Sequence, residues 1–316
     1  MPVPVTSPVE APNIAPAPKL RKRRFPRVIA QMAWRMRWDL LVYGLVCIVS
    51  LLPALQPRLL KLVALPTAGL SMVGVTISIF VAFRNTQAIS RWWEARVLWG
   101  GAVNASRHWR DSLRILLGPE HHHQPTEGHL LGLQVLQVWL LNFELRGFWR
   151  PDLRAAVDEL TGQLDLPVDI DLQQSMQARA ESIAALYQQG IINNWGRDLL
   201  LRNTEVFTNL LGGMQRIRNT PLPPVYDVFI RLICWGCGYV LFMNLTAGAG
   251  ITGMGLFLGF LLAERIGAYV EGPFDRDGSS FSLPLDSLCL GISRDLLGPD
   301  HPLGQLQIPQ DPTLWS

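Results

Sequence analysis

One stretch of this 316-residue sequence limits what the chain can fold into more than any other. Residues 62–83 carry no formal charge, and they continue directly into a charged segment that ends near Trp99. A helix needs about 20 apolar residues to cross the hydrocarbon core of a bilayer. No Gly or Pro lies between Val75 and Leu98, so one helix can leave the membrane and continue into water. The sequence therefore predicts an integral membrane protein.

The charged continuation carries cations and indole rings where the helix would leave the bilayer. Tryptophan favours the headgroup layer, and lysine and arginine are enriched on the cytoplasmic side of membranes. We therefore expect the helix to reach the cytoplasmic interface here. The residues of this exit are Arg84, Asn85, Arg91, Trp92, Trp93, Glu94 and Arg96.

Within the apolar part, Val75, Ile79 and Phe83 recur every four residues, so they share one helix face. Two interpretations of this spacing are open. The three side chains can face lipid or a protein core, or copies of them around an axis can form apolar rings that gate a pore by dewetting. Ile77 and Val81 lie on another face, and we expect them to face lipid.

Three segments together resemble one protein family. Residues 84–100 contain Arg-Asn, RWWEAR and Trp-Gly, residues 216–226 contain TPLP, and residues 271–289 contain PF followed by LPLD and a Cys. Over residues 25–298 the chain resembles the bestrophin family, in particular its bacterial branch. Bacterial members usually carry Asn-Asp before LPLD, and this chain has Phe-Ser instead.

The resemblance implies an all-α, pentameric ion channel with four transmembrane helices per subunit and a helical cytosolic region. It also implies a pore neck of three apolar residues on the second span, the last of them eight residues before RWWEAR. On this sequence these positions are Val75, Ile79 and Phe83. The family narrows again in the cytosol, and by distance from TPLP that constriction falls near residues 191–195, where we expect it at Ile192.

Apolar segments at 40–55, 62–83, 228–247 and 251–262 predict the four spans. Eight Lys and Arg residues precede the first span, against two in the loop expected at 56–61. Positive charge favours the cytoplasmic side, so the N-terminus is expected there, and four spans return the C-terminus to the same side. We expect a multi-pass protein of the cell (inner) membrane.

The sequence divides into five regions. Residues 1–27 are a Pro- and Ala-rich arm, expected to be disordered, that ends in a basic cluster suited to anionic lipid. Residues 28–83 hold the first two spans, and 84–220 show apolar residues at three- and four-residue spacing, which predicts cytosolic helices. Residues 221–270 hold the other two spans, and 271–316 are expected to form a cytosolic tail.

Several polar features have simple interpretations. Arg231, at the start of the third span, is expected to reach the interface, bind an anion or pair with Asp227. Gly255 and Gly259 form a GxxxG pair, which permits close helix approach. Residues 152–171 are acidic and contain proline, so we expect them on the surface.

The composition and motifs argue against an enzyme. We find no convergent titratable residues, no phosphate-binding loop and no HExxH. Three adjacent histidines in the expected loop at 121–129 cannot share a helix face, so no metal site is expected there. Cys234 and Cys237 form CWGC inside an apolar span, where we expect small buried side chains rather than a redox pair. We expect no cofactor.

The sequence therefore favours an ion channel for small monovalent ions over a membrane enzyme or a non-conducting scaffold. Arg84, Arg91 and Arg96 favour anions such as chloride, and a cation-selective (sodium) channel remains the alternative. Animal bestrophins coordinate Ca²⁺ after PF, but this chain has only Asp275 and Asp277 there, too few oxygen ligands for a Ca²⁺ cage. The expected partners are further copies of the chain in a homopentamer, membrane lipid and small inorganic ions. With a net charge of only +3 and no basic face, we expect no nucleic acid.

Overall fold

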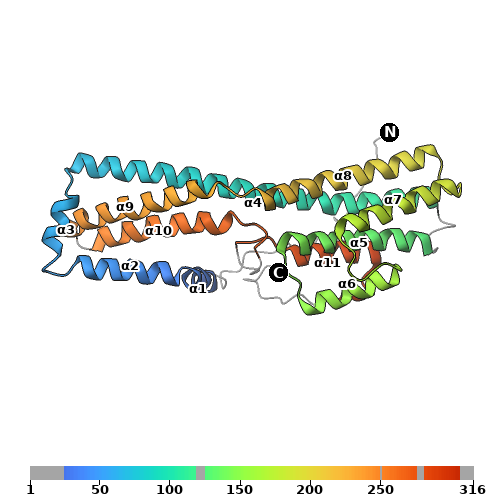
Figure 1. The fold of residues 1–316 in the computed structure, drawn as a ribbon, viewed down its shortest axis with the longest axis horizontal. Helices are drawn as coiled ribbons and strands as arrows, with labels where there is room; N and C mark the ends of the chain where they lie inside the picture. The colour runs from blue at the N-terminus through green and yellow to red at the C-terminus, as the bar shows by residue number, and fades with distance from the viewer. Residues whose placement is uncertain (1–24, 119–124, 250, 276–280, 307–316) are drawn as a thin grey trace, which may run out of the picture.

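One helix organises the whole molecule. The computed structural model describes residues 25–118, 125–249, 251–275 and 281–306, which form twelve α-helices and no strand. Helix α4 (Thr67–Leu117) runs the length of the elongated molecule (Figure 1). At 1.5 Å per residue its 51 residues span about 77 Å, far more than a bilayer core. The expectation that one helix continues from the apolar span into the charged segment is confirmed.

The first half of the molecule, which we call the transmembrane half, contains four helices side by side (Figure 1). They are α2 (Arg37–Ser50), the first part of α4, α9 (Pro224–Ala249) and α10 (Ile251–Val270). The short helix α3 (Gln56–Val63) connects α2 to α4 at the far end, where Asn244 of α9 donates a 2.8 Å hydrogen bond to the carbonyl oxygen of Val63. Residues 56–61 are therefore helical, contrary to the expected loop.

Helices α4, α9 and α10 are each long and apolar enough to cross a membrane. Helix α2 has 14 residues and a length of about 21 Å, and it is not among the candidate spans found in the described residues. The apolar run at 40–55 is interrupted because Pro53 ends the helical pattern and the chain turns at 51–55.

The core of the transmembrane half lies between α4, α9 and α10. Ile77 and Val81 of α4 are buried there with Phe242 of α9 and Phe257 of α10. The expectation that Ile77 and Val81 face lipid is wrong, because the inward face of α4 runs through these two residues and on to Arg84.

Two glycines allow α9 and α10 to pack closely. A Cβ at Gly238 would lie 2.5 Å from the ring of Phe257, and a Cβ at Gly253 would lie 2.7 Å from a backbone oxygen of α9. A Cβ at Gly255 or Gly259 would meet open space. The GxxxG pair therefore makes no close helix contact within one subunit, and other glycines do so instead.

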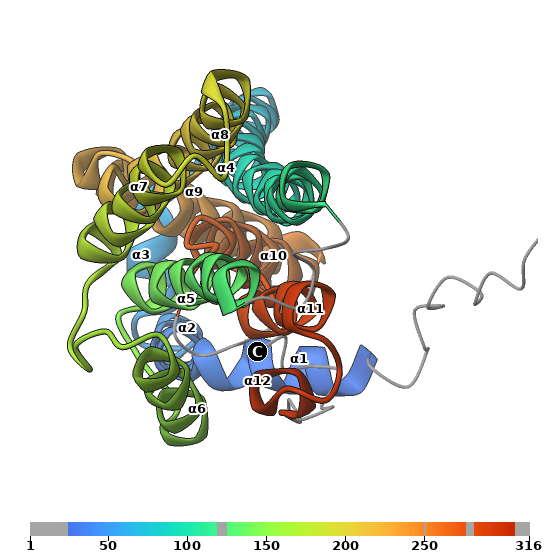
Figure 2. The same cartoon turned by 90° about the vertical axis from the view of Figure 1, so that its right-hand side faces the viewer.

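The second half, which we call the body, surrounds helix α5 (Pro125–Arg146). Residues 130–142 are all buried, and Figure 2 shows α5 among the other helices of the body. These helices are the second part of α4, α6 (Pro151–Gln163), α7 (Leu172–Gln188), α8 (Asn194–Asn219), α11 (Leu285–Leu297) and α12 (Pro302–Gln305). Asp171 begins α7 with a capping box, in which it accepts from the backbone of Gln174 at 2.7 Å.

Three expectations for the body are corrected. Residues 152–171 are not simply surface, because Leu153, Val157 and Leu160 share the inward face of α6. The segment expected to be a tail after residue 271 is part of the body, because α11 and α12 insert apolar side chains into the same core. Residues 125–129 belong to α5 rather than to a loop, whereas 119–124 lie outside the described residues.

Candidate functional site

The outward face of α4 carries the three residues that the sequence singles out. Val75, Ile79 and Phe83 are 60%, 49% and 62% exposed in the single subunit. They point away from the face that carries Ile77 and Val81. Residues four apart in a helix lie on the same side, whereas residues two apart are separated by about 160° around the helix axis. The subunit therefore leaves this apolar stripe uncovered.

The same face continues into the body with different chemistry. Thr86 and Ser90 follow the apolar stripe and are exposed, and one helix turn further on Trp93 is exposed as well. In the body the face carries Asn104 and His108, also exposed. Helix α4 thus presents one continuous outer face, which is apolar at the stripe and mostly polar beyond it, with the exposed side chains of Trp93 and Val97 among the polar ones.

Arg84, the first charge after the apolar stripe, points inward. Its side chain is only 1% exposed and forms ion pairs with Asp227 at the start of α9 and, at 3.4 Å, with Glu271 just after α10. The side chain of Asn85 lies against Gly267 of α10, where a Cβ would collide with it. The Arg-Asn pair therefore ties α4 to both neighbouring helices at the junction of the two halves.

The charged residues of RWWEAR also hold helices together. Arg91 donates hydrogen bonds of 2.7 Å to the carbonyl oxygens of Ile217 and Thr220, which lie at the end of α8. Carbonyls at a helix end have no partner within the helix, so a cation stabilises them there. Glu94 forms an ion pair of 2.5 Å with Arg216 on the surface of α8.

The remaining motif residues divide between core and surface. Trp92 is half-buried against the core of the body, whereas Trp93 and Arg96 are exposed. Arg84 is buried and paired, and Arg91 is committed to backbone carbonyls. The expected positive surface of three arginines is therefore not present in the subunit, and the argument for anions based on it does not hold.

A second charged cluster, which was not predicted from the sequence, joins α2 to α9 and α10. Asp39 of α2 pairs with Arg231 of α9 at 2.6 Å and with Arg265 of α10 at 3.0 Å. Arg231 does not pair with Asp227, because Asp227 is bound to Arg84. The sequence feature that could have indicated this cluster is Asp39 itself, a single acid between a basic segment and an apolar run.

The LPLD segment anchors α11 to α5. Asp286 is buried, accepts a hydrogen bond of 2.7 Å from Asn142 and lies 3.6 Å from the guanidinium of Arg146. Arg146 also donates to the carbonyl oxygen of Leu283 at 3.2 Å. A buried charge is tolerated only with such partners, so this segment stabilises the body rather than contributing exposed chemistry.

The residue expected at the second constriction is buried. Ile192, in the turn between α7 and α8, is 4% exposed and packs into the core of the body. The neighbouring Ile191 is 40% exposed and Trp195 is 63% exposed. Ile192 would have to leave the core to line a conduit. Gly190 with φ of 71° makes the turn that sends these two isoleucines to opposite sides.

The body also contains a buried cation that was not predicted from the sequence. Arg179 of α7 is 1% exposed, and its guanidinium lies 5.0 Å from the ring centre of Trp109 and 5.3 Å from that of Phe207. It donates to the side-chain oxygen of Gln134, and among the described residues none of its contacts is a carboxylate. Burial lowers the pKa of Arg179 to about 9.

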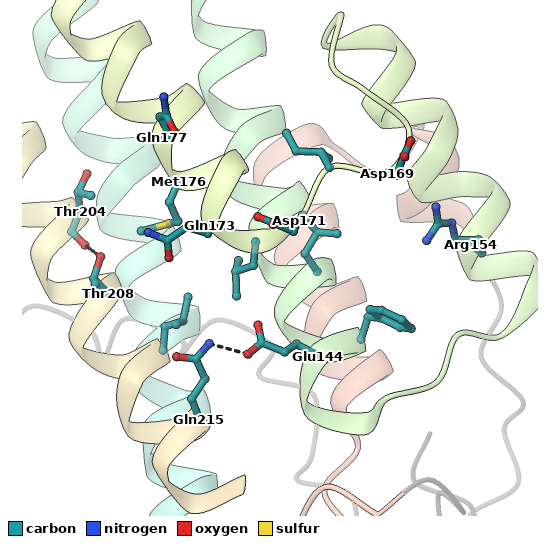
Figure 3. A pocket seen from close by; sticks show the side chains of 15 residues that line it. Glu144, Arg154, Asp169, Asp171, Gln173, Met176, Gln177, Thr204, Thr208 and Gln215 are labelled. Carbon is teal, nitrogen blue, oxygen red and sulfur yellow. Dashed lines mark hydrogen bonds between the residues drawn. The ribbon is translucent and has the colours of Figure 1, made fainter. Parts of the chain in front are cut away.

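A cavity of about 980 Å³ opens in the body between α5, α7 and α8. Its labelled polar side chains are spread around the space rather than converging on one point (Figure 3). Glu144 accepts a 2.6 Å hydrogen bond from Gln215, and Asp171 is committed to capping α7. The cavity contains none of the residues that the sequence predicts to be functional, and its side chains do not form an acid–base arrangement.

The described cysteines have free thiols, and the described His, Cys, Asp and Glu residues form no metal-binding cluster. Cys234 is buried and Cys237 is half-buried, both with free thiols. No group of three or more His, Cys, Asp or Glu residues is placed to hold a metal among the described residues. Asp275 belongs to the described chain, whereas Asp277 lies outside it.

Comparison with known proteins decides the family. The sequence profile described as bacterial/fungal bestrophin protein matches residues 22–298. The chain belongs to this family. The three segments that carry the resemblance, 84–100, 216–226 and 271–289, all lie within the match.

Individual relatives agree with this assignment. A protein of Ralstonia nicotianae is 29% identical over 285 residues, covering 79% of this chain and 89% of the relative. A protein of Mesorhizobium japonicum is 30% identical over 231 residues, covering 69% and 70%. Both are named voltage-dependent anion channel-forming proteins. The crystal structure of a bacterial bestrophin homolog from Klebsiella pneumoniae has the same fold, with a TM-score of 0.68, 24% identity, and coverage of 86% of this chain and 100% of that one.

Proposed function

We propose that this bestrophin-family protein is a pentameric ion channel in which α4 of each subunit lines a central pathway. The observation that carries the proposal is the outward apolar stripe of Val75, Ile79 and Phe83, which the subunit leaves uncovered. One helix cannot enclose a pathway, but copies of it around a rotation axis can. The names of the relatives from Ralstonia and Mesorhizobium support channel activity.

In this arrangement the three side chains form stacked apolar rings, which we take as the neck. An ion that crosses them loses hydration that no side chain replaces, so the rings oppose conduction until they widen. Thr86 and Ser90, one and two turns further along the same face, supply hydroxyl groups at the exit. The junction residues Arg84 and Asn85 fix the rotation of α4 and thereby the direction of the stripe.

We place the second constriction at Ile191 rather than at Ile192. Ile191 is exposed at the turn between α7 and α8, and Ile192 fills the core. The proposed conduit therefore has an apolar neck in the transmembrane half and an apolar ring in the body, separated by the polar part of the outer face of α4.

The proposed topology has four crossings of the inner membrane and both termini in the cytoplasm. Helix α2 is about 21 Å long and the bilayer core is about 30 Å thick, so the turn at 51–55 and α3 would complete the first crossing. The basic residues before α2 favour the cytoplasmic side. The body would then lie in the cytosol.

We propose that the conducted ions are chloride or other small anions. The names of the relatives favour anions. Apolar rings do not select the sign of an ion, so a sodium-conducting channel is the second candidate, and a non-conducting scaffold is the third. The two channel candidates differ in one simple measurement, the reversal potential under a salt gradient.

The decisive experiment is reconstitution of the purified full-length protein in planar bilayers. Discrete currents with a reversal potential close to the chloride equilibrium potential are expected, and a value close to that of the cation would select the second candidate. Native mass spectrometry of the same sample should give five subunits. A pentamer that carries no current at any potential would support the scaffold instead.

A further inference from the structure

Helix α1 (Phe25–Arg35) lies across the end of the bundle rather than along it. In Figure 1 it is seen nearly end-on beside the start of α2, and in Figure 2 it is seen from the side. Its C-terminal end leads through Met36 into α2 at Arg37. It therefore runs roughly in the plane that separates the transmembrane half from the body.

The inner face of α1 is attached to the junction. The guanidinium of Arg35 lies 4.9 Å from the ring centre of Tyr269 and 5.4 Å from that of Phe281. The hydroxyl of Tyr269 donates to the carbonyl oxygen of Arg35 at 3.3 Å. These contacts hold α1 against the segment through which the chain passes from α10 to the body.

The opposite face of α1 is apolar and uncovered. Ile29 is 44% exposed and Trp34 is 70% exposed, and Ala30 and Ala33 between them are exposed as well. A helix on the surface of a water-soluble protein directs its apolar face inward. The apolar face of α1 points outward instead, which is the arrangement of a helix that lies on a membrane surface.

Cations border the apolar face. The guanidinium of Arg37 lies 4.6 Å from the ring centre of Trp34 and 5.9 Å from that of Trp38, which is 68% exposed. In the sequence, five further cations precede the helix: Lys19, Arg21, Lys22, Arg23 and Arg24. Further along the chain, Leu41 and Leu45 of α2 are exposed apolar side chains as well.

We propose that the outer face of α1 lies in the headgroup layer of the bilayer and binds anionic phospholipid. Apolar side chains enter the boundary of the acyl chains, tryptophans lie at headgroup level, and the cations attract the lipid phosphates. The proposal is independent of whether the protein conducts ions.

The test uses the full-length protein in liposomes of phosphatidylcholine and phosphatidylglycerol. An environment-sensitive fluorophore is attached to Ala33→Cys, and in a second variant to Ala30→Cys on the same face. Bromine atoms, which quench fluorescence, are placed on the acyl chains of one lipid at a time. The control label is at Asn209→Cys, an exposed position on α8 in the body. Wild-type protein treated with the same fluorophore gives the background from the four native thiols.

Both labels on α1 should be quenched, and the control should not be. Brominated phosphatidylglycerol should quench the fluorescence more strongly than expected from its fraction of the lipid mixture, since one cation near an anionic surface favours binding by about fivefold. Arg37→Gln should reduce this preference while the fluorophore stays quenched. Absence of quenching at both α1 labels would show that protein covers this face. Equal quenching by both lipids, unchanged in Arg37→Gln, would show that it does not bind anionic headgroups. Either result would overturn the proposal.

Discussion

The transmembrane half and the body pack their helices against different surroundings. In the transmembrane half, helices bury side chains only where they face each other, and their outer faces expose residues such as Leu41, Leu45 and Ile48. In the body, α5 is enclosed over residues 130–142, and its polar side chains are buried together with partners. The difference indicates that lipid completes the first half, whereas the body forms its own core.

Charges are also distributed differently. The body buries the pair of Asp286 and Arg146 in its interior. The transmembrane half gathers its ion pairs at the end that meets the body, around Arg84 and Asp39. Charges are costly in a hydrocarbon environment, so they are confined to the interface and to protein interiors. Helix α4 belongs to both halves, and its inward face is continuous through the junction.

The largest expected effect tests the core of the body. Asp286→Ala leaves the guanidinium of Arg146 buried without its carboxylate, and losing one partner of a buried pair costs about 3–5 kcal/mol. Asp198→Ala is the matched control, because Asp198 pairs with Arg197 on the surface, where such a pair contributes about 0–1 kcal/mol. Thermal unfolding in detergent measures both. Equal shifts in the two variants would mean that the interior of the body does not depend on this pair.

The next effect compares two positions on the same helix of the transmembrane half. Ile77→Ala removes a fully buried side chain and should lower the stability by about 2–5 kcal/mol. Ile79→Ala, only two residues away but on the exposed face, should cost under about 1 kcal/mol. Unfolding in detergent again provides the comparison. If Ile79→Ala were the more damaging change, α4 would be rotated relative to this structure.

A smaller effect tests the close approach of α9 and α10. Gly238→Ala places a methyl group 2.5 Å from the ring of Phe257, and overpacking of this kind costs about 1–3 kcal/mol. Gly236→Ala, on the same helix, meets nothing within 4 Å and should be neutral or slightly stabilising, since alanine favours helices. The measurement is the melting temperature of each variant. If Gly236→Ala lowered the stability and Gly238→Ala did not, α9 would contact α10 through the opposite face from the one in this structure.

The sequence predicted the long helix α4, the apolar spans α9 and α10, and the family, because these depend on length, composition and short motifs. It also placed Val75, Ile79 and Phe83 on one face, since helical spacing fixes relative direction. It could not fix absolute direction, and Ile77 and Val81 were assigned to lipid although both are buried. In a span, an apolar side chain suits lipid and protein equally, so composition carries no information about which side faces inward.

The wrong prediction of a positive surface formed by three arginines has a similar cause. Arg84, Arg91 and Arg96 have equal charge in the sequence, but one is buried in an ion pair, one caps α8 and one is exposed. Their partners, such as Asp227 and Thr220, are more than 100 residues away in the chain. Pairings of this kind arise from the packing of distant helices and have no local signature. The same holds for Ile192, whose burial depends on the turn after α7.

The central claim is that the outer face of α4 lines the conducting pathway, and one comparison of currents tests it most directly. The variant with Val75, Ile79 and Phe83 all replaced by Ala is compared with a variant in which three exposed apolar residues of α2, Leu41, Leu45 and Ile48, are replaced by Ala. Both are recorded in planar bilayers beside the wild-type protein. Smaller side chains widen the proposed rings and let water persist, so the α4 variant should show higher conductance or open probability, while the α2 variant behaves like the wild type. Unchanged currents in the α4 variant, or an equal increase in the α2 variant, would contradict a pathway lined by this face.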